Sequence, residues 1–81
     1  MSRRDKLLEK AISSPSNLRF DEVCSLAEEF GFIHRGGKGS HRIYKRAGVS
    51  RPMNFQNDGG KAKAYQVKQL LEVLRELGEI E

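Results

Sequence analysis

The C-terminal segment carries the most regular apolar pattern of the chain, and this pattern constrains how the rest can fold. Five apolar residues recur at i, i+3, i+4, i+7 and i+10, the spacing of one helix face: Val67, Leu70, Leu71, Leu74 and Leu77. Such a face must be buried, and Gly78 follows it as a residue suited to ending a helix. We therefore predict a closing helix whose leucine face forms one wall of the core.

Two segments nearer the N-terminus also have helical spacing. Ser2 is a good N-cap for a helix over residues 3–12, and residues 13–17 (SSPSN) have the composition of a loop. Asp21 is the expected N-cap of a second helix, which ends before Gly31, where a positive φ is expected. The apolar positions of these two helices are Leu7, Leu8, Ala11 and Ile12 in the first, and Val23, Leu26, Ala27 and Phe30 in the second.

The middle of the chain favours strands separated by glycine-rich turns. Phe32–Arg35 and Ser40–Arg46 flank the predicted turn Gly36-Gly37-Lys38-Gly39, which suggests a β-hairpin. A third strand is expected over residues 50–56, either at the edge of the sheet or beginning after Pro52, because proline cannot donate to a strand ladder. Residues 57–60 are expected to form a loop.

Alternation along the second strand divides its side chains between two faces. One face carries His41, Ile43 and Lys45, and the other carries Ser40, Arg42 and Tyr44. Each face has one apolar residue, so the pattern does not say which face is buried.

The order of these elements predicts an α+β fold in which helices cover one face of a three-stranded antiparallel sheet. The 81 residues suit one domain, and a hydrophobic fraction of 37% suits a modest core. No apolar run is long enough to span a membrane, and the N-terminus lacks the apolar stretch of a secretory signal. Cys24 is the only cysteine, so no disulfide can form within the chain, and we expect a cytoplasmic protein.

Positive charge is concentrated in the middle third of a chain whose formal net charge is +4. Glu29 and Asp58 are consecutive acids, so residues 30–57 form an acid-free window. Its basic residues are Arg35, Lys38, Arg42, Lys45, Arg46 and Arg51. A one-sided patch of this kind suits a polyanion, whereas a solubilising surface usually mixes both signs.

Several kinds of site find little support in the residue spacing. The segment GGKGS lacks the spacing of a phosphate-binding P-loop, and Cys24, His34 and His41 match no zinc pattern. A magnesium-dependent nuclease would need carboxylates inside the basic window, which holds none. We therefore expect neither a metal nor a cofactor.

His41 is the residue of the window best suited to proton transfer. Histidine titrates nearest neutrality, and the neighbouring cations should disfavour its charged form. A neutral imidazole among cations that hold a phosphate can take the proton from an RNA 2′-hydroxyl, which DNA lacks. A surface histidine that stacks on a base or contacts phosphate is the simpler interpretation, and residue chemistry leaves both open.

The segment FGF followed by RGGKGSHRIYKR, with its Gly39-Ser40-His41 motif, resembles the HicA family of mRNA-interferase toxins from HicA–HicB toxin–antitoxin pairs. The resemblance covers nearly the whole chain and includes NLRFDEVCSLAEEFGF and the closing AYQVKQLLEVL. It implies a single HicA-like domain over residues 1–81, with a fold like that of double-stranded-RNA-binding domains. It also implies a metal-independent endoribonuclease held inactive by a HicB-like antitoxin protein.

The resemblance assigns the motif histidine's role to His41 and none to His34. Many members of the family carry a Pro-x-His segment on the third strand, where this chain has Pro52-Met53-Asn54. We expect Lys38, Arg42 and Lys45 to bind RNA phosphates, and Arg35 and Arg46 to extend that binding surface. The residues expected to shape the turn are Gly36, Gly37, Gly39 and Ser40. The alternative is a non-catalytic RNA-binding module with the same sheet.

Overall fold

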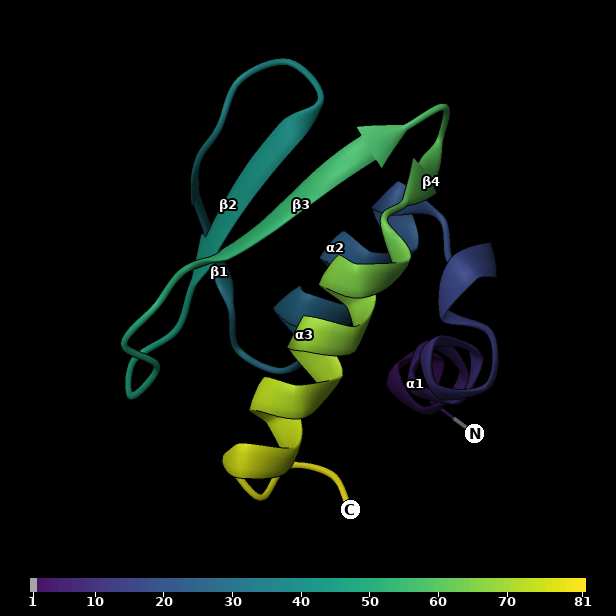
Figure 1. Ribbon diagram of the computed structural model, residues 1–81. Helices are drawn as coiled ribbons and strands as arrows, with labels where there is room; N and C mark the ends of the chain where they lie inside the picture. Colours follow the sequence, from purple (N-terminus) through teal and green to yellow (C-terminus); the bar gives the residue numbers. More distant parts are fainter. Residues whose placement is uncertain (1) are drawn as a thin grey trace.

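The computed structural model describes residues 2–81 and shows an α+β fold, as predicted (Figure 1). Within these residues it contains three α-helices, one 3₁₀ turn and one four-stranded sheet. The elements are α1 (Arg3–Ser13), η1 (Pro15–Asn17), α2 (Phe20–Glu29), β1 (Ile33–Gly36), β2 (His41–Lys45), β3 (Met53–Asp58), β4 (Lys61–Ala62) and α3 (Ala64–Glu76). None of the helices in residues 2–81 has the length and apolar character needed to cross a membrane.

Helix α1 begins as the sequence predicts, because the Asp5 backbone N–H donates to the Ser2 hydroxyl at 3.1 Å. Leu7 and Ala11 are buried on its inner face, and Leu8 packs at the margin of the core. Ile12 is 49% exposed, so the predicted apolar stripe is narrower than expected.

Helix α2 begins at Phe20, so the prediction of Asp21 as its N-cap is wrong. The reason is tertiary: the Phe20 N–H donates to the Gly60 carbonyl at 3.0 Å, which fixes the chain as it enters the helix. Asp21 lies instead in the first turn, where the helix dipole stabilises a carboxylate. The helix ends before Gly31, whose φ of +87° confirms the predicted left-handed position.

Glu22 ties the start of α2 to two other groups. Its carboxylate accepts from the Arg19 backbone N–H at 2.9 Å and from the Lys10 ammonium at 2.8 Å. Partial burial raises the pKa of Glu22, but these two hydrogen bonds outweigh that effect and leave the pKa below its ordinary value. The contact with Lys10 also joins α1 to α2.

The sheet is an antiparallel meander in the order β1-β2-β3-β4, so the prediction of three strands is corrected to four. Asn57 and Asp58 continue β3, and the Gly59-Gly60 turn reverses the chain into β4. Both glycines have positive φ, as a two-residue hairpin turn requires. The predicted loop over residues 57–60 is therefore mostly strand and tight turn. β3 begins after Pro52, one of the two alternatives, and lies inside the sheet rather than at its edge.

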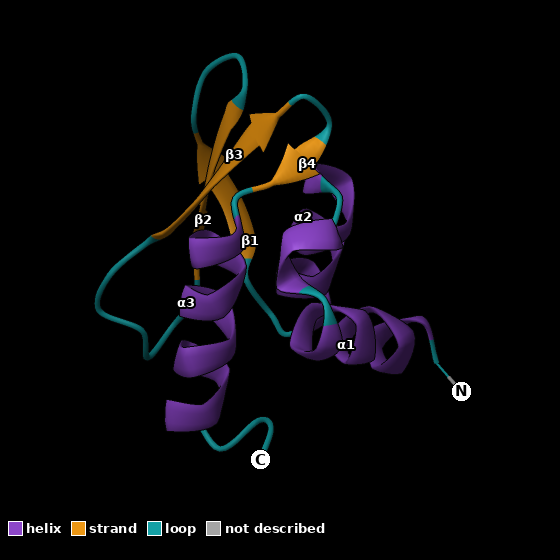
Figure 2. Ribbon diagram, turned by 45° about the vertical axis from the view of Figure 1, so that its right-hand side comes forward, coloured by secondary structure: helices purple, strands orange, loops and turns teal. Residues whose placement is uncertain are grey.

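Burial settles which face of β2 points inward. Tyr44 is buried and packs beside Phe55, with ring centroids 5.7 Å apart, while its hydroxyl donates to the Glu28 carboxylate at 2.6 Å. The helices lie on this side of the sheet (Figure 2). The opposite side, which we call the outer face, therefore carries His41, Ile43 and Lys45.

Helix α3 covers the inner face with the predicted leucine face. Four of the five predicted positions are buried: Val67, Leu70, Leu71 and Leu74. Leu77 packs at the margin, and Gly78 ends the helix with a φ of +75°. In addition, the Gln66 side-chain oxygen accepts from the Gln56 backbone N–H at 2.8 Å, which satisfies a β3 donor beyond the reach of β4.

Candidate nucleic-acid interface

A tight loop between β1 and β2 positions the candidate catalytic residue. Gly36 is the last residue of β1 and pairs with Ile43, so its predicted place in the turn is wrong. The turn proper uses Gly37 and Gly39, whose φ angles are +112° and +59°. A Cβ on Gly37 would lie 2.4 Å from the His41 carbonyl oxygen and 2.9 Å from the Arg42 Cα. Glycine therefore lets the loop fold back directly against the start of β2.

The backbone around His41 is fixed from two sides. Its N–H donates to the Lys38 carbonyl at 3.0 Å, within the loop. The Ser40 carbonyl accepts from the Asn57 N–H, and His41 pairs with Gln56 of β3. The imidazole itself is exposed at the first position of β2. An exposed side chain on a fixed backbone is suited to meeting a bound substrate.

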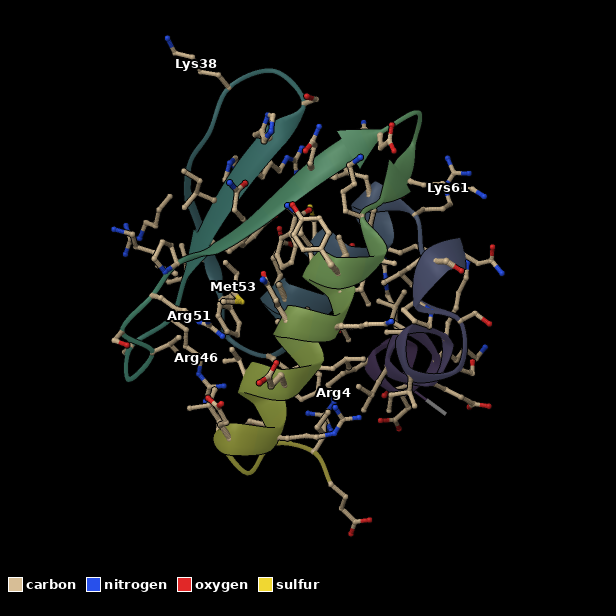
Figure 3. All side chains as sticks on the ribbon, in the orientation of Figure 1. Arg4, Lys38, Arg46, Arg51, Met53 and Lys61 are labelled. Carbon is tan, nitrogen blue, oxygen red and sulfur yellow. The ribbon has the colours of Figure 1, made fainter. Side chains whose placement is uncertain are left out.

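The outer face carries His41 and one of the predicted phosphate ligands, Lys45, at its opposite ends. Lys45 shares that face, four residues along the same strand, so the two Cα atoms are about 13 Å apart. Lys38 projects from the β1–β2 loop (Figure 3). Between His41 and Lys45 lies half-buried Ile43, with Asn54 paired opposite it on β3. The face is thus mixed, with an apolar and amide surface between cationic ends.

Arg42 lies on the other side of the sheet from His41. Its guanidinium stands 5.5 Å from the centroid of the Phe20 ring, at the start of α2. On this side the guanidinium also lies near the Tyr44 hydroxyl and the Glu28 carboxylate, and the side chain stays exposed. The structure therefore does not place Arg42 beside the imidazole, although the two residues are adjacent in sequence.

Two further arginines of the window have different surroundings. Arg46 donates to the Glu79 carboxylate at 2.8 Å, and only 24% of its side chain is exposed. Within residues 2–81 its second terminal nitrogen is buried without a hydrogen-bond partner. Arg35 is exposed at the irregularity in β1 between His34 and Gly36. The six cations of the acid-free window thus do not form one continuous cluster.

The surroundings of His34 and Cys24 suit a structural rather than a catalytic role. His34 stacks on Tyr44 with ring centroids 5.4 Å apart, and its Nε2 lies 2.9 Å from the Gly36 carbonyl oxygen. Cys24 is buried, and that burial raises the pKa of its thiol, which disfavours the nucleophilic thiolate. In residues 2–81 no three His, Cys, Asp or Glu side chains are grouped so as to hold a metal ion.

Sequence reasoning missed two exposed cations, Arg19 and Lys61, that the fold pairs beside Phe20, the residue that Arg42 contacts. Arg19 and Lys61 are paired across an isolated antiparallel bridge, and both lie outside the acid-free window. The two residues are more than forty positions apart in the sequence, so counting charge along the chain does not group them. The signal that would have found them is the Gly59-Gly60 pair, which is typical of a two-residue hairpin turn.

Comparisons of the chain with models of protein families, with curated proteins and with solved structures found no match. The resemblance to the HicA family therefore stays a prediction, and the functional argument depends on the residues and their geometry.

Proposed function

We propose that this protein is a metal-independent endoribonuclease, the toxin of a type II toxin–antitoxin pair, with His41 as its general acid or base. One observation carries the proposal. His41 is exposed on the outer face of the sheet, on a backbone fixed by the Gly37–Ser40 turn and by β3, with Lys38 in the preceding loop and Lys45 at the far end of the same face.

The chemistry follows from these positions. The His41 imidazole takes the proton of an RNA 2′-hydroxyl, and the 2′-oxygen then attacks the adjacent phosphorus. A new bond forms between the 2′-oxygen and phosphorus, and the bond from phosphorus to the 5′-oxygen breaks. That leaving oxygen takes a proton from a second group or from water. Lys38 and Lys45 neutralise charge that develops on the phosphoryl oxygens.

The architecture supports a fold like that of double-stranded-RNA-binding domains. Elements α2, β1, β2, β3 and α3 run in the order expected for that fold, with a sheet that helices cover on one side. Helix α1 and strand β4 are additions to this arrangement. A sheet with one open side offers RNA a surface without any change in the core.

The non-catalytic RNA-binding module is the second candidate, and one observation favours it. The residue paired opposite His41 is Gln56, and Asn54 stands two positions before it on β3. Neither amide can serve as the second proton-transfer group at neutral pH. If water cannot replace that group, the same surface would hold RNA without cutting it.

One incubation separates the two candidates. The purified chain is mixed with a defined RNA, with and without EDTA, and His41→Ala prepared in parallel controls for contaminating ribonuclease. We expect equal cleavage in both conditions by wild type and none by the variant. Binding without cleavage would favour the non-catalytic module, and cleavage abolished by EDTA would contradict a metal-independent mechanism.

The proposed partner is a HicB-like antitoxin that shares the cytoplasm with this chain. An acidic surface complements the cationic ends of the outer face, and covering His41 would silence the enzyme. Hydrogen exchange of residues 36–46 should slow when the antitoxin binds. Equal exchange in the free and bound states would contradict inhibition by coverage of this site.

A further inference from the structure

A second cationic surface lies at one end of the sheet, outside the site described above. Its members are Arg19, Arg42 and Lys61, and we call it the end patch. All three side chains are exposed: Arg19 directly precedes α2, Arg42 lies in β2 and Lys61 lies in β4. In Figure 3, Lys38 and Lys61 project from opposite sides of this same end of the sheet.

One cation–π contact and one backbone hydrogen bond connect the three cations through Phe20 and Gly60. The Arg42 guanidinium lies over the Phe20 ring, and the Phe20 N–H donates to the Gly60 carbonyl. Arg19 directly precedes that phenylalanine, and Lys61 directly follows that glycine. The end patch is therefore built by the fold, because no pair of its members is adjacent in sequence.

Two like charges face each other within the end patch, which destabilises the free protein. Arg19 and Lys61 are directly opposite across an antiparallel bridge, where like charges are destabilising. Asp21 lies 3.5 Å from Arg19, but both side chains are more than half exposed, so the pair contributes little. Asp58 is the cross-strand partner of Lys61 in the β3–β4 hairpin, but its carboxylate makes its ion pair with Lys63, at 3.1 Å. A bound polyanion would relieve this repulsion.

The end patch is within reach of an RNA bound at His41. Ser40 is hydrogen-bonded to Asn57, Asn57 pairs with Ala62, and the Ala62 N–H donates to the Leu18 carbonyl. These three steps span about 14 Å at the usual spacing between strands. A few nucleotides crossing the ends of β2, β3 and β4 would cover that distance.

We infer that the end patch binds the phosphates of the single-stranded RNA segment that flanks the nucleotide held at His41. The exposed Arg42 guanidinium over Phe20 also offers a plane on which a nucleotide base can stack. This inference rests on the proposed function for the RNA as ligand. It adds residues that set affinity and substrate length, and it assigns them no part in proton transfer.

Salt-dependent binding tests the inference. The probe is a fluorescein-labelled 12-nucleotide single-stranded RNA, bound by chains that all carry His41→Ala so that the probe stays intact. Arg19→Ala and Lys61→Ala should each reduce the slope of log affinity against log salt by about 0.7, and the double variant by about 1.4. Lys6→Ala, which removes an exposed charge from α1, is the matched control and should leave the slope unchanged.

The cleavage assay supplies a second measurement. Lys61→Ala in a chain with His41 intact should lower kcat/KM several-fold and leave the single-turnover rate at saturating protein unchanged, because the patch contributes binding alone. If Arg19→Ala does not fold, Lys61→Ala and Lys61→Gln carry the test, since Lys61 is exposed.

The possible outcomes distinguish this inference from the proposed function. Slopes for the patch variants equal to that of Lys6→Ala would overturn the end patch and leave catalysis at His41 standing. Patch-dependent binding by a wild type that cuts no RNA would support the end patch and overturn the catalytic proposal. Failure of the reference chain to bind RNA at 50 mM salt, the low end of the usual salt range, would overturn both.

Discussion

Replacing Gly37 by alanine should both destabilise the protein and displace His41. Gly37 has a φ of +112°, which L side chains rarely adopt. An added Cβ would lie 2.4 Å from the His41 carbonyl oxygen, whereas ordinary contacts begin at 3.4 Å. The atoms that the Cβ meets are backbone, so the loop and the first residue of β2 must separate by about 1 Å.

The expected magnitude has two parts. Backbone strain at such a φ costs about 1–3 kcal/mol, and overpacking against a fixed neighbour costs about 1–3 kcal/mol more. We therefore expect a loss of about 2–6 kcal/mol in the free energy of unfolding. At about 0.05–0.15 kcal/mol per residue, a chain of this length has about 4–12 kcal/mol in total. The variant should fold but be much weakened.

Two neighbouring glycines provide matched controls. Gly39 has a φ of +59° with open space around its Cβ position, so Gly39→Ala should cost about 1–2 kcal/mol from backbone conformation alone. Gly36 has neither a positive φ nor a neighbour within 4 Å, so Gly36→Ala should be neutral or slightly stabilising. The three variants thus separate steric contact from backbone conformation.

Urea unfolding followed by circular dichroism measures the series. With a slope near 1 kcal/mol per molar urea, the midpoint should fall by about 2–6 M for Gly37→Ala and by about 1–2 M for Gly39→Ala. Because a misplacement of about 1 Å can cost about 10²-fold in rate, RNA cleavage by Gly37→Ala should fall by that order. Equal midpoints for the Gly37 and Gly39 variants would refute the close contact on which this reasoning depends.

Three other outcomes are expected. Leu71→Ala should cost about 2–5 kcal/mol in urea unfolding, because the side chain is 4% exposed against the core, and a loss under about 1 kcal/mol would contradict that packing. The pKa of Glu22 lies below its ordinary value, so its stabilisation is complete above the unfolded-state pKa and is lost as the pH falls through the folded one. The stability difference between wild type and Glu22→Gln should therefore shrink below about pH 4, and a constant difference would reject this account. Because Glu79 already compensates Arg46, Arg46→Ala should leave the salt dependence of RNA binding unchanged, whereas Lys45→Ala should reduce its slope by about 0.7.

The helices and the hairpin were predictable because their signals are local. The leucine spacing of α3 and the glycines that end α2 and α3 depend only on nearby residues, and the structure confirms them. Strand β4 was not predictable in this way, because a strand of two residues has no periodicity. It exists through its pairing with β3 and its hydrogen bonds to the segment before α2.

The orientation of β2 needed tertiary information. Ile43 and Tyr44 give its two faces equal apolar content. Tyr44 is the buried one, because its hydroxyl donates to Glu28 and its ring packs beside Phe55. That choice places His41 and Arg42 on opposite sides of the sheet. The acid-free window could not show this, because it is defined along the sequence and residues adjacent in sequence can lie on opposite sides of a sheet.

The surroundings of the charges were hidden for the same reason. Arg46 pairs with Glu79, which is 33 residues away, and the end patch joins residues of β2 and β4 with the residue that precedes α2. Counting charge along the chain therefore identified a cationic protein but not the grouping of its cations.

The central claim is that His41 transfers the proton of a 2′-hydroxyl. Its most direct test is the single-turnover cleavage of two RNAs that differ only by a 2′-deoxy group at the cut nucleotide. The proteins compared are wild type, His41→Ala and, as the matched histidine control, His34→Ala.

We expect wild type to cut the all-ribose substrate and to bind but not cut the deoxy one. His41→Ala should lose about 10²–10⁴-fold in rate while folding and binding RNA nearly as wild type does, and His34→Ala should lose far less. Cleavage of the all-ribose RNA by His41→Ala at the wild-type rate, or of the deoxy substrate as fast as of RNA, would contradict the mechanism.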